Sequence, residues 1–231
     1  MESGGCILIF FVVISLQYDW LGGIVVLFFN QLRGKEDPKA LDRLVMDSAL
    51  ILLLGIGLGI FSKFLDCTAV NELPYFLEYL DVRNFLGRFA IWMLLGVWIS
   101  VCSNSAARAS VNVFLFFFGM VTSYYLYTHF IAGFFPGKYA MIWFGITALS
   151  PLPAFLCWYA KGKGKISFAL SVGILAVLFQ ASFVFGWLYF EVRSVLELVV
   201  FLLGILILRR DTVKETVMLA ALGIGLGLLL G

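Results

Sequence analysis

The chain has 231 residues, of which 62% are hydrophobic and 13% are charged, with a net charge of +2. Soluble domains contain roughly 25% charged residues, so this composition excludes an ordinary water-soluble domain and is typical of a multi-pass membrane protein. The few Lys and Arg residues form no basic face with interleaved aromatic residues, so we expect no nucleic-acid partner. The predicted fold is all-α, a polytopic transmembrane helix bundle of seven or eight spans in the lipid bilayer.

We interpret residues 1–231 as a single integral membrane domain, because spans and short connections leave no room for a globular domain on either flank. Residues 1–44 are expected to form an accessory first span and a cytoplasmic loop. Residues 45–190 form the core, and residues 191–231 form two C-terminal spans.

Residues 4–32 are mostly apolar, and their polar residues include Gln17, Tyr18, Asp19 and Asn30. As one helix this segment is about 40 Å long, and Asp19 lies near its middle. The alternative is a re-entrant pair of short helices that turns at residues 18–23. The first interpretation gives eight spans with both termini outside, and the second gives seven with the N-terminus inside.

The apolar stretches that follow predict further spans. Arg108, Lys138 and Lys161 separate two long stretches without charge, which indicate a transmembrane hairpin because neither stretch leaves a face for water. Residues 66–84 form the longest connection, and their aromatic side chains suit a segment at the level of the lipid headgroups. The predicted spans lie at about 45–61, 85–102, 109–137, 139–160, 166–189, 195–208 and 216–231, with a tight turn at 190–193.

Orientation follows from Lys and Arg in short loops, which remain preferentially in the cytoplasm. These residues are more numerous on one side of the predicted bundle than on the other. Four basic loops are therefore predicted to be cytoplasmic: 31–43, 103–110, 161–165 and 209–215. Arg108 and the Lys161–Lys165 run are interpreted as headgroup anchors.

The stretch ARASVNVFLFFFGMVTSYYLYTHFIAGFFPGKYAMIWFGITALSPLPAFLCWYAKGKG, residues 107–164, carries a resemblance to a known family. Over about residues 45–190, the chain resembles an uncharacterised family of small multi-pass membrane proteins from Gram-positive bacteria. The resemblance implies a bacterial plasma membrane and supplies no catalytic or binding residues. The first 40 or so residues and the final helix lie outside the similar part.

Polar or kinked positions at membrane depth are functional candidates, because lipid makes them costly. Pro151 and Pro153 remove two backbone donors and predict a kink near the middle of the bilayer. Broken helices of this kind build substrate sites in transporters, but proline kinks also merely shape bundles. The predicted midplane polar site comprises Asp19, Thr122, Ser123, Thr147, Ser150, Pro151 and Gln180. For each of these residues alone, helix packing is the favoured explanation, and only their convergence at the kink would form a polar cavity.

Two similar stretches, LGIGLGIF at 54–61 and LGIGLGLL at 222–229, form a weak internal repeat. Parallel repeats occur in transporters. Glycines spaced by four, here Gly55 with Gly59 and Gly223 with Gly227, are also a general surface for close helix packing. The same faces are where a membrane-protein partner or a second copy of the chain is expected to bind.

Enzyme signatures are absent from the sequence: it contains no H-E-x-x-H, G-x-S-x-G or P-loop motif. The single histidine, His129, cannot make a metal site by itself and is interpreted either as part of an aromatic belt or as a pH-sensitive gate. We expect no catalytic residue, cofactor or metal. A Cys6–Cys67 disulfide and a local Arg193–Glu197 ion pair are further expectations.

Two functions remain open. The first is a small permease or transport subunit with its site at the Pro151 kink. The alternative is a non-catalytic partner protein that uses the glycine-rich helix faces and the 66–84 loop. An intramembrane enzyme would additionally need a carboxylate pair that opens to water.

Overall fold

The computed structural model describes residues 32–34, 40–69, 72–186 and 189–231. This part of the chain contains ten helices and one two-stranded hairpin, so the predicted all-α class is confirmed. The predicted first segment, residues 4–32, lies outside the described residues except for Leu32. In chain order the elements are α2 (Leu41–Cys67), α3 (Tyr75–Tyr79), α4 (Val82–Leu86), α5 (Phe89–Cys102), α6 (Ala106–Phe130), α7 (Gly137–Leu149), α8 (Pro151–Ala160), α9 (Lys165–Ser182), β1 (Phe183–Gly186), β2 (Tyr189–Val192), α10 (Val195–Ile207) and α11 (Val213–Leu230).

Four of the described helices, α2, α6, α9 and α11, are long and apolar enough to cross a membrane. Together α7 and α8 make a fifth candidate span, bent by 41°. The apolar helices α5 and α10 have 14 and 13 residues. At 1.5 Å per residue each is about 20 Å long, short of a ~30 Å hydrocarbon layer. The chain is therefore a helical membrane protein, and the predicted count of seven or eight spans is not confirmed.

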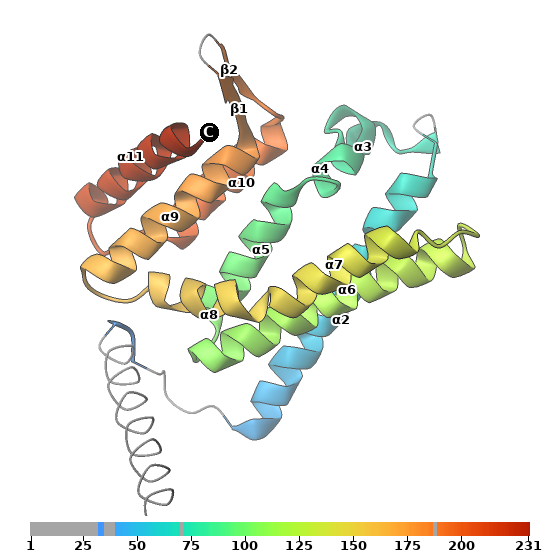
Figure 1. Ribbon diagram of the computed structural model, residues 1–231, viewed down its shortest axis with the longest axis horizontal. Coiled ribbons are helices and arrows are strands. Elements are labelled where there is room, and N and C mark those ends of the chain that lie inside the picture. The colour runs from blue at the N-terminus through green and yellow to red at the C-terminus, as the bar shows by residue number, and fades with distance from the viewer. Residues whose placement is uncertain (1–31, 35–39, 70–71, 187–188) are drawn as a thin grey trace, which may run out of the picture.

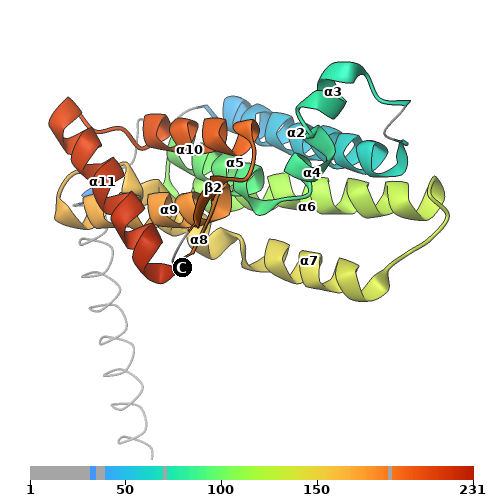
Figure 2. The same cartoon turned by 90° about the horizontal axis from the view of Figure 1, so that it is seen from above.

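The helices form two groups (Figure 1). One contains α2, α6 and α7, and the other contains α9, α10, α11 and the β-hairpin. Helix α5 lies between the groups and contacts α6, α8, α9 and α10. Helix α8 joins the groups along the chain, and Figure 2 shows the same division from above.

Glycines bring α2 and α6 into direct backbone contact. A Cβ atom on Gly55 would lie 2.1 Å from the carbonyl oxygen of Phe116, and one on Gly59 would lie 2.2 Å from that of Met120. Residue numbers rise together along this contact, so the two helices run parallel. Two parallel neighbours require α5 to return between them, which agrees with the predicted alternation of spans.

The second glycine pair packs in the same way, between α11 and α9. A Cβ atom on Gly223 would lie 2.9 Å from Leu175, and one on Gly227 would lie 2.6 Å from the ring of Phe179. The interpretation of these glycines as helix-packing surfaces is confirmed. Both pairs are covered within the chain, so neither is a free face for the partner or second copy expected there.

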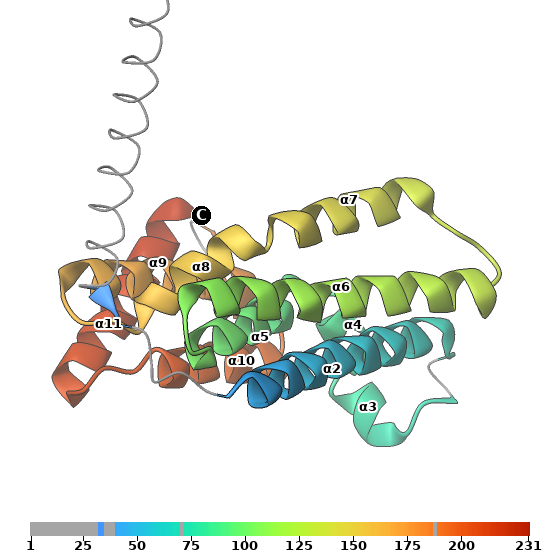
Figure 3. The ribbon, with the colours of Figure 1, turned by 90° about the horizontal axis from the view of Figure 1, so that it is seen from below.

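The predicted kink at the prolines is confirmed as the 41° break between α7 and α8. Pro151 is the first residue of α8, where a missing N–H group removes no intrahelical hydrogen bond. The Ser150 amide donates to the Thr147 carbonyl over 3.1 Å, and the Ser150 hydroxyl donates to the same oxygen over 2.8 Å. Figure 3 shows α7 and α8 meeting at this bend, on the same side of α6.

The predicted helix 166–189 is too long, because α9 ends at Ser182 and a β-hairpin follows. Phe183 pairs with Val192, and Val184 pairs with Glu191. The predicted turn at 190–193 is therefore mostly strand β2. Aromatic and β-branched residues favour strands, and the ring of Phe183 stacks on that of Phe190 with centroids 5.3 Å apart.

Three cations stabilise the end of the bundle where α5, α8 and α10 finish. Arg33 donates to the carbonyls of Trp158 and Val101 over 2.9 and 3.1 Å. Lys161 donates to the Ile207 carbonyl over 2.8 Å, and Arg210 to that of Gly162 over 2.7 Å. Carbonyls at helix C-termini lack intrahelical partners, and cations satisfy them.

This arrangement corrects the interpretation of Arg108 and Lys161 as headgroup anchors. Arg108 donates to the Leu44 carbonyl over 2.5 Å and to the Ser48 hydroxyl over 2.7 Å, so it joins α6 to α2. Lys161 is bound to helix ends. The described residues of the four loops predicted to share one side, among them Arg33, Arg108, Lys161 and Arg210, do lie at one end of the bundle.

The expected Arg193–Glu197 ion pair is also wrong. Glu197 pairs with Arg88, at the start of α5. Residues four positions apart lie side by side only when both are in one helix. Helix α10 begins at Val195, so Arg193 lies outside it.

Candidate functional site

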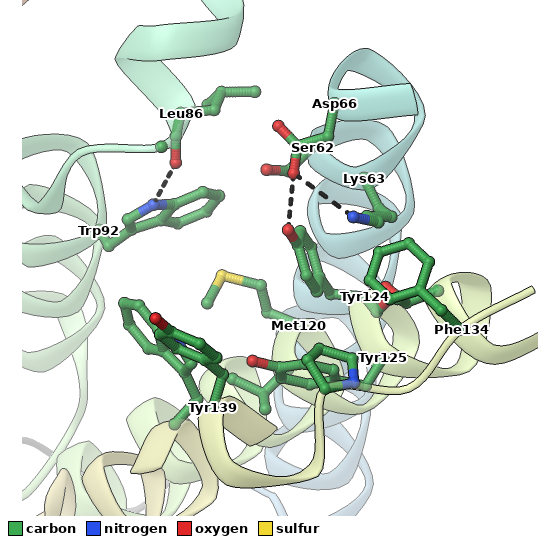
Figure 4. Close-up of a pocket in the computed structure, with 15 residues that line it drawn as sticks. Ser62, Lys63, Asp66, Leu86, Trp92, Met120, Tyr124, Tyr125, Phe134 and Tyr139 are labelled. Carbon is green, nitrogen blue, oxygen red and sulfur yellow. Dashed lines mark hydrogen bonds and ion pairs between the residues drawn. The ribbon is translucent and has the colours of Figure 1, made fainter. Parts of the chain in front are cut away.

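A pocket of about 290 Å³ opens where α2 and α6 end. Its lining comes from the last turns of α2, the end of α4, the start of α5, the second half of α6, the connection between α6 and α7, and the first half of α7. We name it the Lys63 pocket, and it is lined by Ser62, Lys63, Asp66, Leu86, Gly87, Trp92, Met120, Val121, Tyr124, Tyr125, Thr128, Phe134, Pro136, Tyr139 and Trp143. Figure 4 shows Lys63, Asp66 and Tyr124 on one side, Leu86 and Trp92 on the other, and Met120 between them.

Lys63 is the buried cation of this pocket, with a side chain that is only 9% exposed. Its ammonium nitrogen lies 4.9 Å from the ring centre of Tyr124 and 5.2 Å from that of Phe134, which are cation–π distances. The nearest carboxylate oxygen, on Asp66, is 3.9 Å away. Figure 4 marks this ion pair with a dashed line. Among the described residues the Lys63 nitrogen makes no hydrogen bond, so its three donors remain for a ligand or for water.

Asp66 and Tyr124 fix the polar corner of the pocket. The Tyr124 hydroxyl donates to Oδ2 of Asp66 over 2.6 Å, which links α6 to α2. Lys63 and Asp66 are three residues apart on α2 and therefore lie on one helix face. The Asp66 side chain is 33% exposed, so its carboxylate remains accessible.

The opposite wall is aromatic and is fixed by two contacts. The Trp92 indole N–H donates to the Leu86 carbonyl over 2.8 Å, which orients the ring. Phe89 of α5 stacks on Trp143 of α7, with ring centroids 5.3 Å apart, so α5 and α7 close this side. A mostly apolar, concave site with a few convergent polar groups is typical of small-molecule binding.

A second cavity of about 250 Å³ lies at the opposite end of the same helices, and we name it the Arg108 cavity. It is lined by α2 near Asp47, by the end of α5 with Ser103, and by the start of α6 with Arg108 and Asn112. The Ser48 hydroxyl donates to the side-chain oxygen of Asn112 over 2.8 Å. The Asn112 amide donates to the Ser103 hydroxyl over 3.1 Å, which ties α6 to the end of α5.

The predicted midplane site does not come together among the residues described. Ser123 donates to the carbonyls of Ile56 and Met120, at the α2–α6 contact. The hydroxyl oxygen of Thr122 is buried and has no hydrogen-bond partner in the described part of the chain. Asp19 lies outside the described residues.

The polar side chains around the kink form hydrogen bonds to backbone carbonyl groups. Thr147 and Ser150 are buried, and the Ser150 hydroxyl bonds within its own turn. The Pro151 carbonyl accepts from Ser110, which is 13 positions before Ser123 and so about 20 Å from it along α6. Gln180 donates to the Gly227 carbonyl on α11 over 3.1 Å. None of the described predicted residues lines the Lys63 pocket or the Arg108 cavity.

Sequence reasoning missed the residues that do line the Lys63 pocket. The available signal was an i, i+3 pair of opposite charges, Lys63 and Asp66, next to an apolar run long enough to span. In the sequence this pair looks like ordinary charged residues at the edge of a loop. Its role in a pocket is visible only in the fold, where Tyr124 of α6 contacts Asp66. His129 is exposed and contacts the rings of Phe130 and Phe135. In the described ranges no three His, Cys, Asp or Glu side chains form a group that could hold a metal ion.

Apolar helices around two mostly apolar cavities, each with a few polar groups, define the class: a helical membrane protein with a candidate small-molecule site. No protein-family model matches the chain, and no curated protein or solved structure is found to be similar to it.

Proposed function

We propose that the protein is a small membrane permease whose substrate path follows the interface of α2, α5 and α6. The proposal retains transport as the function and moves the path away from the Pro151 kink. The observation that carries it is the position of the two cavities, which lie at opposite ends of the same three helices. An access route through a membrane needs an opening toward each side of one shared helix interface.

The short length of α5 explains why cavities lie at both its ends. A helix of about 20 Å leaves the longer pair α2 and α6 uncovered above and below it. Residues at the start of α5, such as Trp92, line the Lys63 pocket. Residues at its end, such as Trp98 and Cys102, line the Arg108 cavity.

The segment between the cavities is closed and apolar. On α6 it comprises residues 113–119, about 12 Å of helix between Asn112 and Met120. Phe116 is fully buried in it. A Cβ atom on Gly96 of α5 would lie 3.5 Å from the Phe117 ring, so α5 and α6 are in contact here. This closed segment supports an occluded state in which substrate moves only after the helices shift.

The proposal includes the topology. Helices α5 and α10 complete the alternation as short spans, because α2 and α6, and likewise α9 and α11, run parallel around them. With residues 4–32 this gives the seven or eight spans expected from the sequence. The end that carries Arg33, Lys161 and Arg210 faces the cytoplasm of a bacterial plasma membrane, which the excess of basic residues there supports.

Uptake by proteoliposomes tests the path. The full chain is reconstituted, and a panel of labelled amino acids, sugars and inorganic ions is assayed for uptake. Gly96→Leu, which fills the contact between α5 and the Phe117 ring, should abolish the uptake that the wild type shows. Ser150→Ala, at the kink, should leave it unchanged. Loss of uptake in Ser150→Ala with normal uptake in Gly96→Leu would return the path to the Pro151 region.

A specific observation favours the alternative, a non-catalytic partner protein. The aromatic side chains of Tyr75, Phe76 and Tyr79 in the 66–84 connection are 61–78% exposed. Such side chains suit either the headgroup region or the surface of another membrane protein. Replacement of all three by Ser should leave uptake intact under the permease proposal. If uptake is absent from the wild type and the triple variant loses a co-purifying membrane protein, the alternative is favoured.

A further inference from the structure

We infer that the Lys63 pocket binds a small zwitterion that carries an apolar or aromatic group, with its anion on Lys63 and its cation on Asp66. This inference deepens the proposed function, because it names the substrate class of the proposed path. The source of the zwitterion is either a free amino acid or a zwitterionic lipid headgroup. The two share the chemistry that the pocket recognises.

The ammonium group of Lys63 provides the first half of the argument. It is nine-tenths buried, lines the pocket, and among the described residues makes no hydrogen bond. The rings of Tyr124 and Phe134 beside it stabilise the positive charge, but they accept no conventional hydrogen bond from its three N–H groups. A buried charge without hydrogen bonds is costly, so a carboxylate or phosphate oxygen that enters here gains charge-assisted bonds.

The carboxylate of Asp66 provides the second half. Its Oδ2 atom accepts from Tyr124 and lies 3.9 Å from Lys63. Its other oxygen accepts no hydrogen bond among the described residues, and the side chain is one-third exposed. A ligand ammonium group can therefore reach Asp66 without displacing the tyrosine.

Charge balance selects the zwitterion over simpler ions. The pocket already holds one positive and one negative group side by side, and no further charged residue lines it. A simple anion on Lys63 would lie close to Asp66, and a simple cation on Asp66 would lie close to Lys63. Like charges at such distances repel, and the repulsion grows as the ligand displaces water from the pocket. Only a ligand with both charges pairs each group and leaves the site neutral.

The remaining lining sets the apolar part of the ligand. Trp92, Trp143 and Tyr139 present rings opposite the charged corner. The volume of about 290 Å³ is at the lower end of small-molecule sites. A single side chain of aromatic size fits this description better than a long acyl chain.

Calorimetric titration of the full chain in detergent micelles tests the assignment with three matched probes. L-phenylalanine carries both charges, 3-phenylpropanoate lacks the ammonium group, and 2-phenylethylamine lacks the carboxylate. We expect L-phenylalanine to bind at least about tenfold more tightly than either of the others. Equal or tighter binding of either singly charged probe would overturn the proposal.

Glycerophosphocholine in the same titration distinguishes the sources. Tighter binding of L-phenylalanine identifies a free amino acid as the ligand class, and tighter binding of glycerophosphocholine identifies a lipid headgroup. Either result supports a zwitterion site. Binding of neither compound would refute it.

Two charge variants should change which of the three probes binds most tightly, rather than merely weaken binding of L-phenylalanine. Lys63→Met leaves Asp66 alone, so 2-phenylethylamine should become the preferred probe by about tenfold. Asp66→Asn leaves Lys63 alone, so 3-phenylpropanoate should become preferred. A misfolded variant would bind none of the three probes. A change in the preferred probe therefore cannot arise from unfolding. Uniform weakening of all three probes in both variants, with normal thermal unfolding, would contradict the roles assigned to the two charges.

Exposed charges near the pocket supply the controls. Lys138→Met and Glu78→Gln remove one cation and one anion at the same end of the bundle, and both should leave the affinities unchanged. Binding and transport can fail separately. L-phenylalanine that binds but is not taken up refutes the permease proposal alone, and uptake of another solute without zwitterion binding refutes the site alone.

Discussion

The carboxylate of Glu197 lies 2.5 Å from the guanidinium group of Arg88, although 109 residues separate the two in sequence. Glu197 is fully buried, near the start of α10, and the Ser194 hydroxyl also donates to it. Arg88 is the residue immediately before α5 and lies 3.6 Å from Asp81 as well. This ion pair joins the start of α5 to α10, at the end of the bundle opposite Arg33 and Lys161.

Loss of Arg88 should be more damaging than loss of the charge on Glu197. Arg88→Gln leaves a buried carboxylate without its cation, which typically costs about 3 kcal/mol. Glu197→Gln leaves a partly exposed cation with Asp81 nearby, and the expected loss is about 1–2 kcal/mol. Denaturant unfolding in detergent micelles measures both. The double variant should lose less than the sum of the two, because the groups interact directly.

Arg193→Gln is the matched control for that series. Arg193 is exposed, four residues before Glu197, and should change stability by no more than about 0.5 kcal/mol. A loss as large as that of Arg88→Gln would mean that the local pair exists after all.

Gly59→Ala should destabilise the protein, whereas Gly57→Ala should not. The new methyl group at position 59 would lie 2.2 Å from the Met120 carbonyl oxygen, so α2 and α6 must separate. Overpacking of this kind costs about 1–3 kcal/mol. Gly57 is on the same helix, but a Cβ atom there would have no packing neighbour within 4 Å outside its own turn of backbone. Thermal unfolding that ranks the two variants equally would show that the helices do not meet through Gly59.

Two of the described cysteines are exposed and allow a direct test of the topology. Cys67 ends α2 and Cys102 ends α5, so they lie at opposite ends of the bundle. In intact cells, a membrane-impermeant maleimide should modify Cys67 and spare Cys102 when the other cysteines are replaced by Ser. The reverse pattern would invert the topology. Modification of Cys67 in the presence of Cys6 also tests the expected disulfide, since Cys6 lies outside the described residues.

Lys161 should make stability depend on pH in the alkaline range. Burial lowers the pKa of its ammonium group, and the nearby charges of Arg209, Arg210 and Arg33 lower it further. Below its ordinary value of about 10.4 the unfolded chain therefore binds more protons at this group than the folded chain does. Stability should rise with pH between the lowered pKa and that value.

Lys161→Gln isolates this contribution. The variant should lose the pH-dependent rise, and it should also lose the hydrogen bonds from the ammonium group to the Ile207 and Arg209 carbonyls. Exposed Lys165 provides the control, because Lys165→Gln should keep the rise. A wild-type stability that is flat or falls as the pH approaches about 10.4 from below would contradict the assignment.

The sequence alone determined the class of the protein, most helix positions and the bend at Pro151. Lipid offers backbone groups no hydrogen bonds, so a long uncharged segment is expected to be helical over most of its length. The β-hairpin after Ser182 is the exception. Proline acts on its own turn, so its effect on α7 and α8 is equally local. Composition and single residues are sufficient for conclusions of this kind.

Only the tertiary structure decided which polar groups meet. Lys63, Asp66 and Tyr124 come from two helices, and Tyr124 lies 58 residues beyond Asp66. Glu197 could be assigned its partner only once α10 was placed beside α5. A helix that is apolar on every side has no face that its sequence marks as inward. Its rotation and register are set by contacts such as those of Gly55 and Gly59, and a shift of one residue would bring different side chains together.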